Sequence, residues 1–298
     1  MRKFIKIHLL VITLGFSFVS CKQSSHAQNS QNKTHSRNLT QEFKDYWYQG
    51  NAEISTYELS ENKYGELRNG KATLIYVTED FVPKKQVKAD KQDSKNDPVL
   101  KLNSVKKFIT GIYPYSIMQS SFLPLQEEKH ATKITTSVQE WCGQTYVQLN
   151  NRKKFEIDTF SYFESQGDKN ISLEKTFTEN EIWNLIRLKG LDGLPTGKID
   201  LIPSFEYIRS SHQDIKAYKA TISNSIENGI VNYSITYPEL KRILTISFQE
   251  KSPFIIESWS DQTNNKQPST AKRIATKKLP YWNLKSKKDE AIRNELGL

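Results

Sequence analysis

Polar and apolar residues alternate along most of this chain, which is the pattern of strands buried on one face. Ala52–Leu59 and Lys71–Glu79 are rich in β-branched and aromatic residues, and the alternation is regular over Thr132–Trp141. These segments predict antiparallel strands. Further strands or strand fragments are expected at Val99–Leu102, Lys107–Ile109, Gly111–Met118, Ser120–Leu125, Gln144–Leu149, Lys154–Glu164, Ile171–Phe177 and Lys198–Pro203.

The C-terminal third has the most regular pattern. Four strand-like segments follow one another with short polar connectors: Ile215–Ile226, Gly229–Tyr237, Lys241–Gln249 and Phe254–Asp261. A spacing of about ten residues with tight connections predicts a β-meander. Thr270–Lys278 is expected to add an edge strand.

Turn and helix signals interrupt the strands at defined places. Asn69-Gly70 is a strong hairpin signal, and Thr178 with Glu181 has the capping-box spacing of a helix that would end near Lys189-Gly190. The three remaining expectations are a short helix after Thr40, a connection at Pro83–Pro98 and a terminal helix at Ser286–Leu296.

The predicted fold is mainly β, with a minor α+β character. We expect one β-rich domain over residues 40–298, built as a curved antiparallel sheet or open half-barrel meander with one packed helix and short terminal helices. This outline is similar to that of exported outer-membrane lipoprotein carriers of the open half-barrel type. A shared fold does not by itself assign a function.

The first 20 residues have the composition of a lipoprotein signal peptide. Arg2, Lys3 and Lys6 precede the apolar segment Ile7–Val19, which is shorter than the roughly 20 residues of a membrane span. Cys21 follows directly, so we expect lipidation of its sulfur and cleavage before it. The alternative is an ordinary cleaved signal with Cys21 beside the cut by chance.

Lipidation would make the bilayer the first partner of this protein. Fatty acyl chains such as palmitate on Cys21 would hold the mature chain at a membrane. Residues 21–39 are mostly polar and predict a flexible tether. Lys22 favours the outer membrane of the cell envelope, and the side of the membrane that the domain faces is not readable.

Charge and cysteine content exclude some classes of function. The net charge is +10, but lysines and aspartates are mixed between Lys84 and Asp97, as in a solvated loop rather than a nucleic-acid groove. We therefore expect no nucleic-acid partner. Cys21 and Cys142 are the only cysteines, so a lipidated Cys21 leaves no intramolecular disulfide.

Catalytic and metal-binding motifs are not readable in the sequence. Cys142 has no diagnostic spacing to His130 or His212, and we interpret it as a small strand residue packed beside Trp141. There is no HxxxH, CxxC, GxSxG or phosphate-binding glycine loop. We accordingly assign no catalytic residue, no metal ligand and no cofactor.

Aromatic residues are the one enrichment that suggests binding. An apolar segment interrupted by two prolines could line a pocket or its rim in a curved sheet, together with a nearby tryptophan. The candidate ligand-binding residues are Tyr113, Tyr115, Met118, Phe122 and Trp141. The ligand class that they predict is hydrophobic.

Four short sequences carry a family resemblance. Tyr113–Met118, Ser137–Gly143, Gln148–Arg152 and Ile202–Tyr207 resemble a group of uncharacterised exported lipoproteins whose members carry the label "septum formation inhibitor Maf". The resemblance covers nearly the whole mature chain. Maf proteins are cytosolic α/β nucleotide pyrophosphatases with an N-terminal serine-arginine motif, which this sequence lacks, so no Maf catalytic residue is carried over.

The leading hypothesis is a non-enzymatic envelope lipoprotein that binds a hydrophobic ligand or an envelope protein. An envelope hydrolase acting on glycan or lipid is the first alternative, and it requires converging carboxylates or Cys142 exposed beside a histidine. The Maf label alone implies a nucleotide pyrophosphatase. A scaffold that only positions other envelope components is the last alternative.

Overall fold

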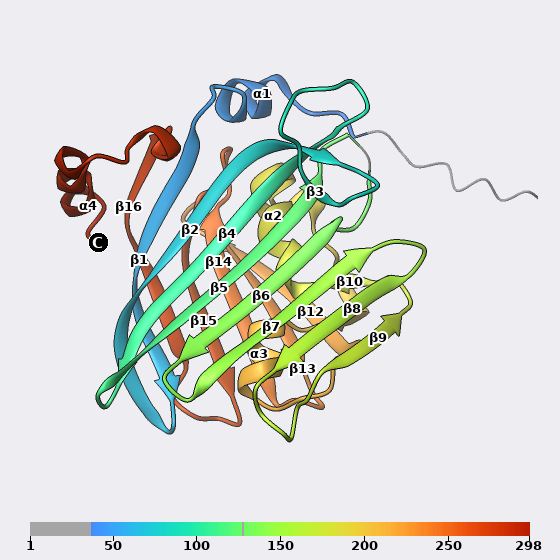
Figure 1. The fold of residues 1–298 in the computed structure, drawn as a ribbon, viewed down its shortest axis with the longest axis vertical. Helices are drawn as coiled ribbons and strands as arrows, with labels where there is room; N and C mark the ends of the chain where they lie inside the picture. Colours follow the sequence, from blue (N-terminus) through green and yellow to red (C-terminus); the bar gives the residue numbers. More distant parts are fainter. Residues whose placement is uncertain (1–36, 127) are drawn as a thin grey trace, which may run out of the picture. The chain divides into compact units, whose positions relative to one another are not determined.

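One strongly curved sheet of sixteen strands dominates the computed structural model (Figure 1). The structure describes residues 37–126 and 128–298, so the predicted signal peptide, Cys21 and most of the predicted tether lie outside the described residues. The strands are β1 (Ala52–Lys63), β2 (Glu66–Val82), β3 (Val87–Lys88), β4 (Asp97–Thr110), β5 (Tyr113–Pro124), β6 (Lys133–Glu140), β7 (Gly143–Asn151), β8 (Phe155–Ser161), β9 (Lys169–Leu173), β10 (Phe177–Thr178), β11 (Gly197–Ile202), β12 (Tyr218–Glu227), β13 (Ile230–Tyr237), β14 (Arg242–Gln249), β15 (Ile256–Thr263) and β16 (Ser269–Leu279).

The order of the strands confirms the predicted curved, open, mainly antiparallel sheet. It runs β10-β11-β12-β13-β14-β15-β16-β1-β2-β4-β5-β6-β7-β8-β9, with β3 paired to β2 outside this path. Every pair is antiparallel except β10 with β11. The sheet bends so far that β4–β7 and β12–β15 lie in two layers with a helix between them (Figure 1).

Short helices cap this sheet. The α-helices are α1 (Gln41–Trp47), α2 (Glu179–Lys189), α3 (Phe205–Ser210) and α4 (Ala291–Glu295), and 3-10 turns lie at Gly190–Gly193, Tyr281–Asn283 and Lys287–Glu290. The predicted capping box of α2 is confirmed, since the Thr178 hydroxyl accepts from the Glu181 backbone N–H and the Glu181 carboxylate accepts from the Thr178 N–H at 3.0 Å. Thr40 caps α1 in a similar way.

Two local predictions are wrong. Asn69-Gly70 is not a hairpin turn, because β2 runs straight through it and the turn lies at Tyr64-Gly65. Gly70 is required for a different reason: a Cβ there would lie 2.3 Å from the Lys107 carbonyl oxygen of β4. The segment Thr270–Lys278 is not an edge strand either, because β16 pairs with both β15 and β1 and joins the two halves of the sheet.

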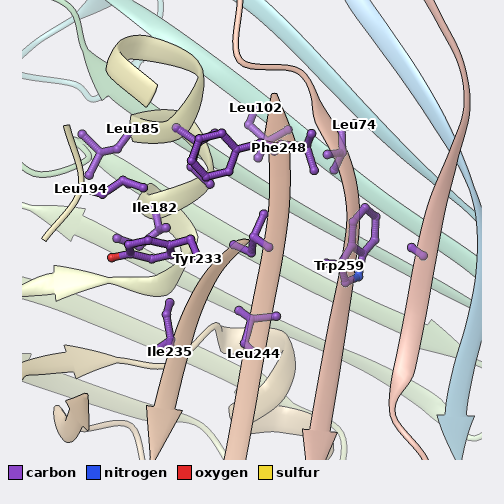
Figure 2. Packing of buried hydrophobic residues seen from close by; sticks show 14 of the residues in the cluster. Leu74, Leu102, Ile182, Leu185, Leu194, Tyr233, Ile235, Leu244, Phe248 and Trp259 are labelled. Carbon is purple, nitrogen blue, oxygen red and sulfur yellow. The ribbon is translucent and has the colours of Figure 1, made fainter. Parts of the chain in front are cut away.

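The core lies between the two layers, around α2. Ile182 of α2 lies beside Tyr233 of β13, and Leu185 of α2 lies beside Leu194, within one buried apolar cluster (Figure 2). A second apolar cluster joins β6–β8 to α3 and to the end of β11. The strand order begins at β10 and ends at β9, and these two strands do not pair with each other. Side-chain packing therefore closes a gap that the strands leave open.

A buried ion pair connects α2 to β1. The Arg187 guanidinium binds both oxygens of Glu53, and its Nη2 lies 2.6 Å from Oε2. Both side chains are at most 1% exposed. The rings of Trp47 and Tyr76 lie about the guanidinium, 5.1 and 4.9 Å from its central carbon. Burial would raise the pKa of Glu53, but the charge and hydrogen bonds of Arg187 outweigh it and hold that pKa below the ordinary value.

Candidate functional site

A cavity of about 970 Å³ lies inside the bent sheet. Its walls come from β4–β6 on one side and β14–β15 on the other, with α2 and α3 contributing residues between them. The cavity opens to solvent at one end, since exposed residues of the β1–β2 and β6–β7 turns, Tyr64 and Cys142, also line it. A volume of this size is in the range of small-molecule binding sites, which is about 300–1,000 Å³.

Part of the lining is apolar. The Trp183 and Trp259 rings meet edge to face with their centroids 5.3 Å apart, one from α2 and one from β15. The other large apolar lining residues include Leu102, Phe108, Ile117, Val138 and Leu244. A hydrocarbon chain placed against these side chains would remove apolar surface of both the ligand and the protein from contact with water. This transfer is favourable by about 25 cal/mol per Å² of apolar surface buried.

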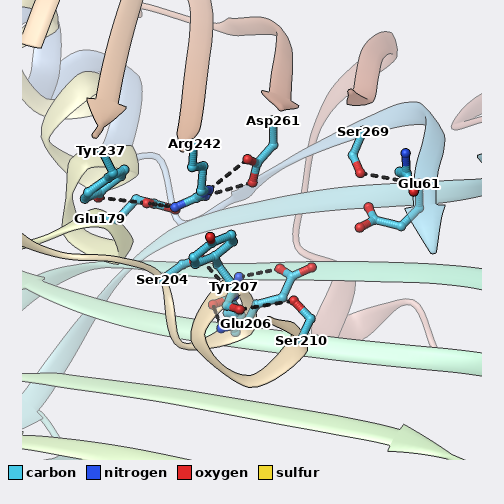
Figure 3. Close-up of polar contacts among 12 residues, drawn as sticks. Glu61, Glu179, Ser204, Glu206, Tyr207, Ser210, Tyr237, Arg242, Asp261 and Ser269 are labelled. Carbon is cyan, nitrogen blue, oxygen red and sulfur yellow. Dashed lines mark hydrogen bonds and ion pairs between the residues drawn. The ribbon is translucent and has the colours of Figure 1, made fainter. Parts of the chain in front are cut away.

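The lining also holds a charged group centred on Arg242, on the same strands as Leu244 and Trp259 (Figure 3). Arg242 begins β14 and points inward, where its guanidinium donates to both oxygens of Glu179 at 2.6 and 2.9 Å and to both oxygens of Asp261 at 2.8 and 2.7 Å. Tyr237 donates its hydroxyl to Glu179 at 3.0 Å, and the Tyr207 ring lies 4.0 Å from the guanidinium carbon. Burial opposes the charge of Arg242, but the two carboxylates raise its pKa well above the ordinary value.

A second charged group surrounds Lys106 of β4. Its ammonium lies 2.8 Å from Glu206 of α3 and 3.5 Å from Glu61 of β1. Gln119 of β5 also donates to Glu206 at 2.8 Å. Burial raises the pKa of Glu61, the charge of Lys106 offsets this only in part, and Glu206 and Asp261 raise it further. Two carboxylates thus converge on one cation inside the cavity.

The opposite pKa shifts of Glu61 and Glu53 give a stability prediction. A carboxyl whose pKa is raised by folding destabilises the native state as it ionises, whereas one whose pKa is lowered stabilises it. We expect Glu61→Gln to change the free energy of unfolding at about pH 7 by between zero and roughly +1 kcal/mol, and Glu53→Gln to lower it by about 3 kcal/mol.

Urea denaturation of both variants measures this difference. The gain from Glu61→Gln should shrink toward about pH 4, where the native carboxyl is itself protonated. If Glu61→Gln lowered the free energy of unfolding as much as Glu53→Gln, the ion pair of Glu61 with Lys106 would stabilise the native state more than burial of the carboxylate destabilises it.

The five predicted ligand-binding residues do not form one site. Tyr115 lines the cavity, and its hydroxyl is 2.7 Å from that of Tyr64. The Tyr113 ring stacks near Tyr115 and Trp141, at centroid distances of 5.9 and 6.3 Å. Trp141 is 69% exposed in the β6–β7 turn. Of the five, Tyr115 alone lines the cavity; Met118 is exposed, and Phe122 packs on Phe81 with their ring centroids 4.9 Å apart.

The interpretation of Cys142 as a packed strand residue is wrong. It lies exposed in the turn between β6 and β7, and its backbone N–H donates to Glu140 at 2.6 Å. Glu140 also raises the pKa of the Cys142 thiol, which disfavours the thiolate. His130 instead contacts Glu181 at 2.8 Å and His212 contacts Gln166 at 2.9 Å. Among the described residues, the contacts of His130 and His212 thus lie with Glu181 and Gln166 and not with the Cys142 thiol.

The charged lining residues were not found from the sequence. Lys106 and Arg242 occupy inward positions of alternating strands, and a charged residue in the apolar register is the signal that could have identified them. Glu206 belongs to α3, whose Ser204 N-cap accepts from the Tyr207 N–H at 3.3 Å and was also missed. The bending of the sheet decides which of these charged side chains contact each other. The polar and apolar pattern within a single strand does not contain that information.

Comparison with protein-family models, with curated proteins and with solved structures finds no match to this chain. Within residues 37–126 and 128–298, no three His, Cys, Asp or Glu side chains gather in a way that could hold a metal ion. None of the helices in the described part of the chain is both long and apolar enough to cross a bilayer. The cavity is therefore the basis on which a function can be argued.

Proposed function

We propose that this protein is a non-enzymatic binding protein of the cell envelope whose cavity holds an amphiphilic molecule. The observation that carries the proposal is the 970 Å³ opening inside the bent sheet, where a protein of this fold could have packed side chains instead. Apolar side chains and ion pairs both line it, so a ligand with a hydrocarbon part and a polar part matches it better than a purely hydrophobic one.

The mouth of the cavity supports access from a membrane surface. Neighbouring antiparallel strands alternate their ends, so the β1–β2, β4–β5 and β6–β7 turns lie at the same end of the sheet. Each presents a large exposed side chain: Tyr64 is 65% exposed, Ile112 83% and Trp141 69%. Exposed tyrosine and tryptophan are typical of membrane interfaces. Lipidation of Cys21, proposed from the sequence, would hold the chain at a bilayer. The described chain enters the domain through α1 at the start of β1, which is the end of the sheet opposite to these turns, so the reach of the mouth depends on the tether (Figure 1).

Isothermal titration calorimetry with decanol and decyl phosphate tests the proposal on the purified full chain. We expect saturable one-to-one binding of at least one of them. Val138→Trp, which fills the cavity, should weaken it at least about tenfold, whereas Gln139→Trp places the same ring on the exposed side of β6 and should leave it unchanged. No binding by either ligand, or equal binding by the filled variant, would refute the proposal.

A hydrolase of glycan or lipid is the second candidate, because Glu61 and Glu206 converge in the cavity. Paired carboxylates are the usual machinery of glycoside hydrolysis. In this cavity, however, Lys106 contacts both carboxylates, which favours an anchored polar wall over an acid and a base. A nucleotide pyrophosphatase of the Maf type would require an α/β fold, and the described residues form an antiparallel sheet, so that alternative is not proposed.

A further inference from the structure

Two cations at the cavity mouth lack the carboxylate partners that the deeper cations have. Lys106 and Arg242 are each held by two carboxylates. Lys63 of β1 and Arg209 of α3 line the same cavity and are partly buried, yet neither lies within 4.0 Å of a carboxylate oxygen among the described residues. Partly buried charges are normally paired, so this arrangement needs an explanation.

Both cations rest on aromatic rings. The Lys63 ammonium lies 5.1 Å from the centroid of Tyr64 and 5.2 Å from that of Tyr115. The Arg209 guanidinium lies 4.8 Å from the centroid of Phe163, and its Nε is shielded from solvent without a hydrogen-bond acceptor. Aromatic faces stabilise cations by about 0.5–2 kcal/mol, but they do not satisfy N–H donors.

Burial and nearby charges act on the pair. Burial has the largest effect on the pKa of Lys63 and lowers it; Glu61 raises it, the charge of Arg209 lowers it by less, and Glu206 and Glu140 raise it. Burial is also the largest cause that lowers the pKa of Arg209. Lys63 and Arg209 line one cavity with like charge, and an anion bound there would be attracted by both.

The carboxylates of the lining are mostly engaged elsewhere. Glu61 and Glu206 bind Lys106, Glu179 and Asp261 bind Arg242, Glu239 binds Lys216, and Glu140 accepts the Cys142 N–H. The exposed Lys241 and Lys266 add further positive charge at the opening. The mouth is consequently positive, whereas the four deeper carboxylates outnumber the two cations that they bind.

We propose that Lys63 and Arg209 bind the phosphate group of an anionic amphiphile. The inference rests on the proposed function and specifies the ligand class of the same cavity. Guanidinium offers a planar fork of N–H donors that matches phosphate oxygens, and ammonium adds a compact charge with three donors. The apolar tail would then extend inward along Phe108 and Ile117, which line the cavity from β4 and β5.

Calorimetric titration of the full chain with decyl phosphate, decanol and inorganic phosphate tests this subsite. We expect decyl phosphate to bind at least about tenfold more tightly than decanol, and Lys63→Gln or Arg209→Gln to weaken decyl phosphate by about tenfold to hundredfold with little effect on decanol. Lys219→Gln is the matched control, because its side chain is 84% exposed and does not line the cavity. Circular dichroism of each variant verifies folding.

Each outcome separates the two proposals. Equal affinity for decanol and decyl phosphate, with both cation variants unaffected, would overturn the phosphate subsite and leave the binding function standing. Absence of binding by both decyl ligands would overturn the binding function. Inorganic phosphate that binds as tightly as decyl phosphate, and is lost in both cation variants, would support the subsite but overturn the amphiphile as its ligand.

Discussion

Arg187→Ala should lower the free energy of unfolding by about 3–5 kcal/mol. The substitution leaves the Glu53 carboxylate buried with only the hydroxyls of Tyr46 and Ser55 as partners, in a site with no exposed surface. It also removes the cation that lies between Trp47 and Tyr76. Chemical denaturation followed by circular dichroism measures the loss, with an unchanged denaturant slope as the sign that the native state stays compact.

Two comparison variants decide whether the buried charge is the cause. Arg152→Ala removes an arginine whose ion pair with Glu156 is 44% and 53% exposed, and it should cost less than about 1 kcal/mol. The double variant Arg187→Met/Glu53→Met removes both charges and should recover most of the stability, because no unpaired ion remains. If the double variant were as unstable as Arg187→Ala, loss of packing would be the cause instead.

Ile246→Ala should lower the free energy of unfolding by about 2–5 kcal/mol, whereas Ile243→Ala should change it by less than about 1 kcal/mol. Both residues lie in β14, three positions apart, and side chains of a strand alternate between its two faces. Ile246 has no exposed surface in the core around α2, and Ile243 is 43% exposed on the other face.

The same substitution on two faces of one strand tests the register of β14 directly. Ile243 pairs with Thr236 of β13 and with Gln262 of β15, so its outward position follows from the ladder on both sides. Thermal and urea unfolding of the two variants under identical conditions measures the contrast. Equal losses would mean that β14 is buried on both faces, which contradicts the two-layer arrangement.

The fold class could be predicted from the sequence because its signals are local. Alternation identified most strands, and Thr178 with Glu181 identified the start of α2. Predictions that depended on position in the sheet were wrong. Nothing local distinguishes β16 as an inner strand, and Asn69-Gly70 has turn chemistry although Gly70 only makes room for the backbone of β4.

The candidate site was harder to predict for a related reason. Aromatic enrichment led to Tyr115, which lines the cavity, but also to Met118 and Phe122, which do not. The ion pairs among lining residues join positions 19 to 100 apart, and Lys106 is 45 positions from Glu61 and 100 from Glu206. Such pairs become neighbours only when the sheet bends, so a reading of one strand at a time could not find them.

Analysis of lipids that copurify with the protein from a bacterial envelope tests the central claim most directly. Full-length wild-type protein, Val138→Trp and Gln139→Trp would be purified in parallel, extracted with organic solvent and compared by mass spectrometry. A phosphate-bearing amphiphile in near-equimolar amount with wild type and Gln139→Trp, and depleted in Val138→Trp, is the predicted result. The same lipid content in all three proteins would contradict a ligand-holding cavity.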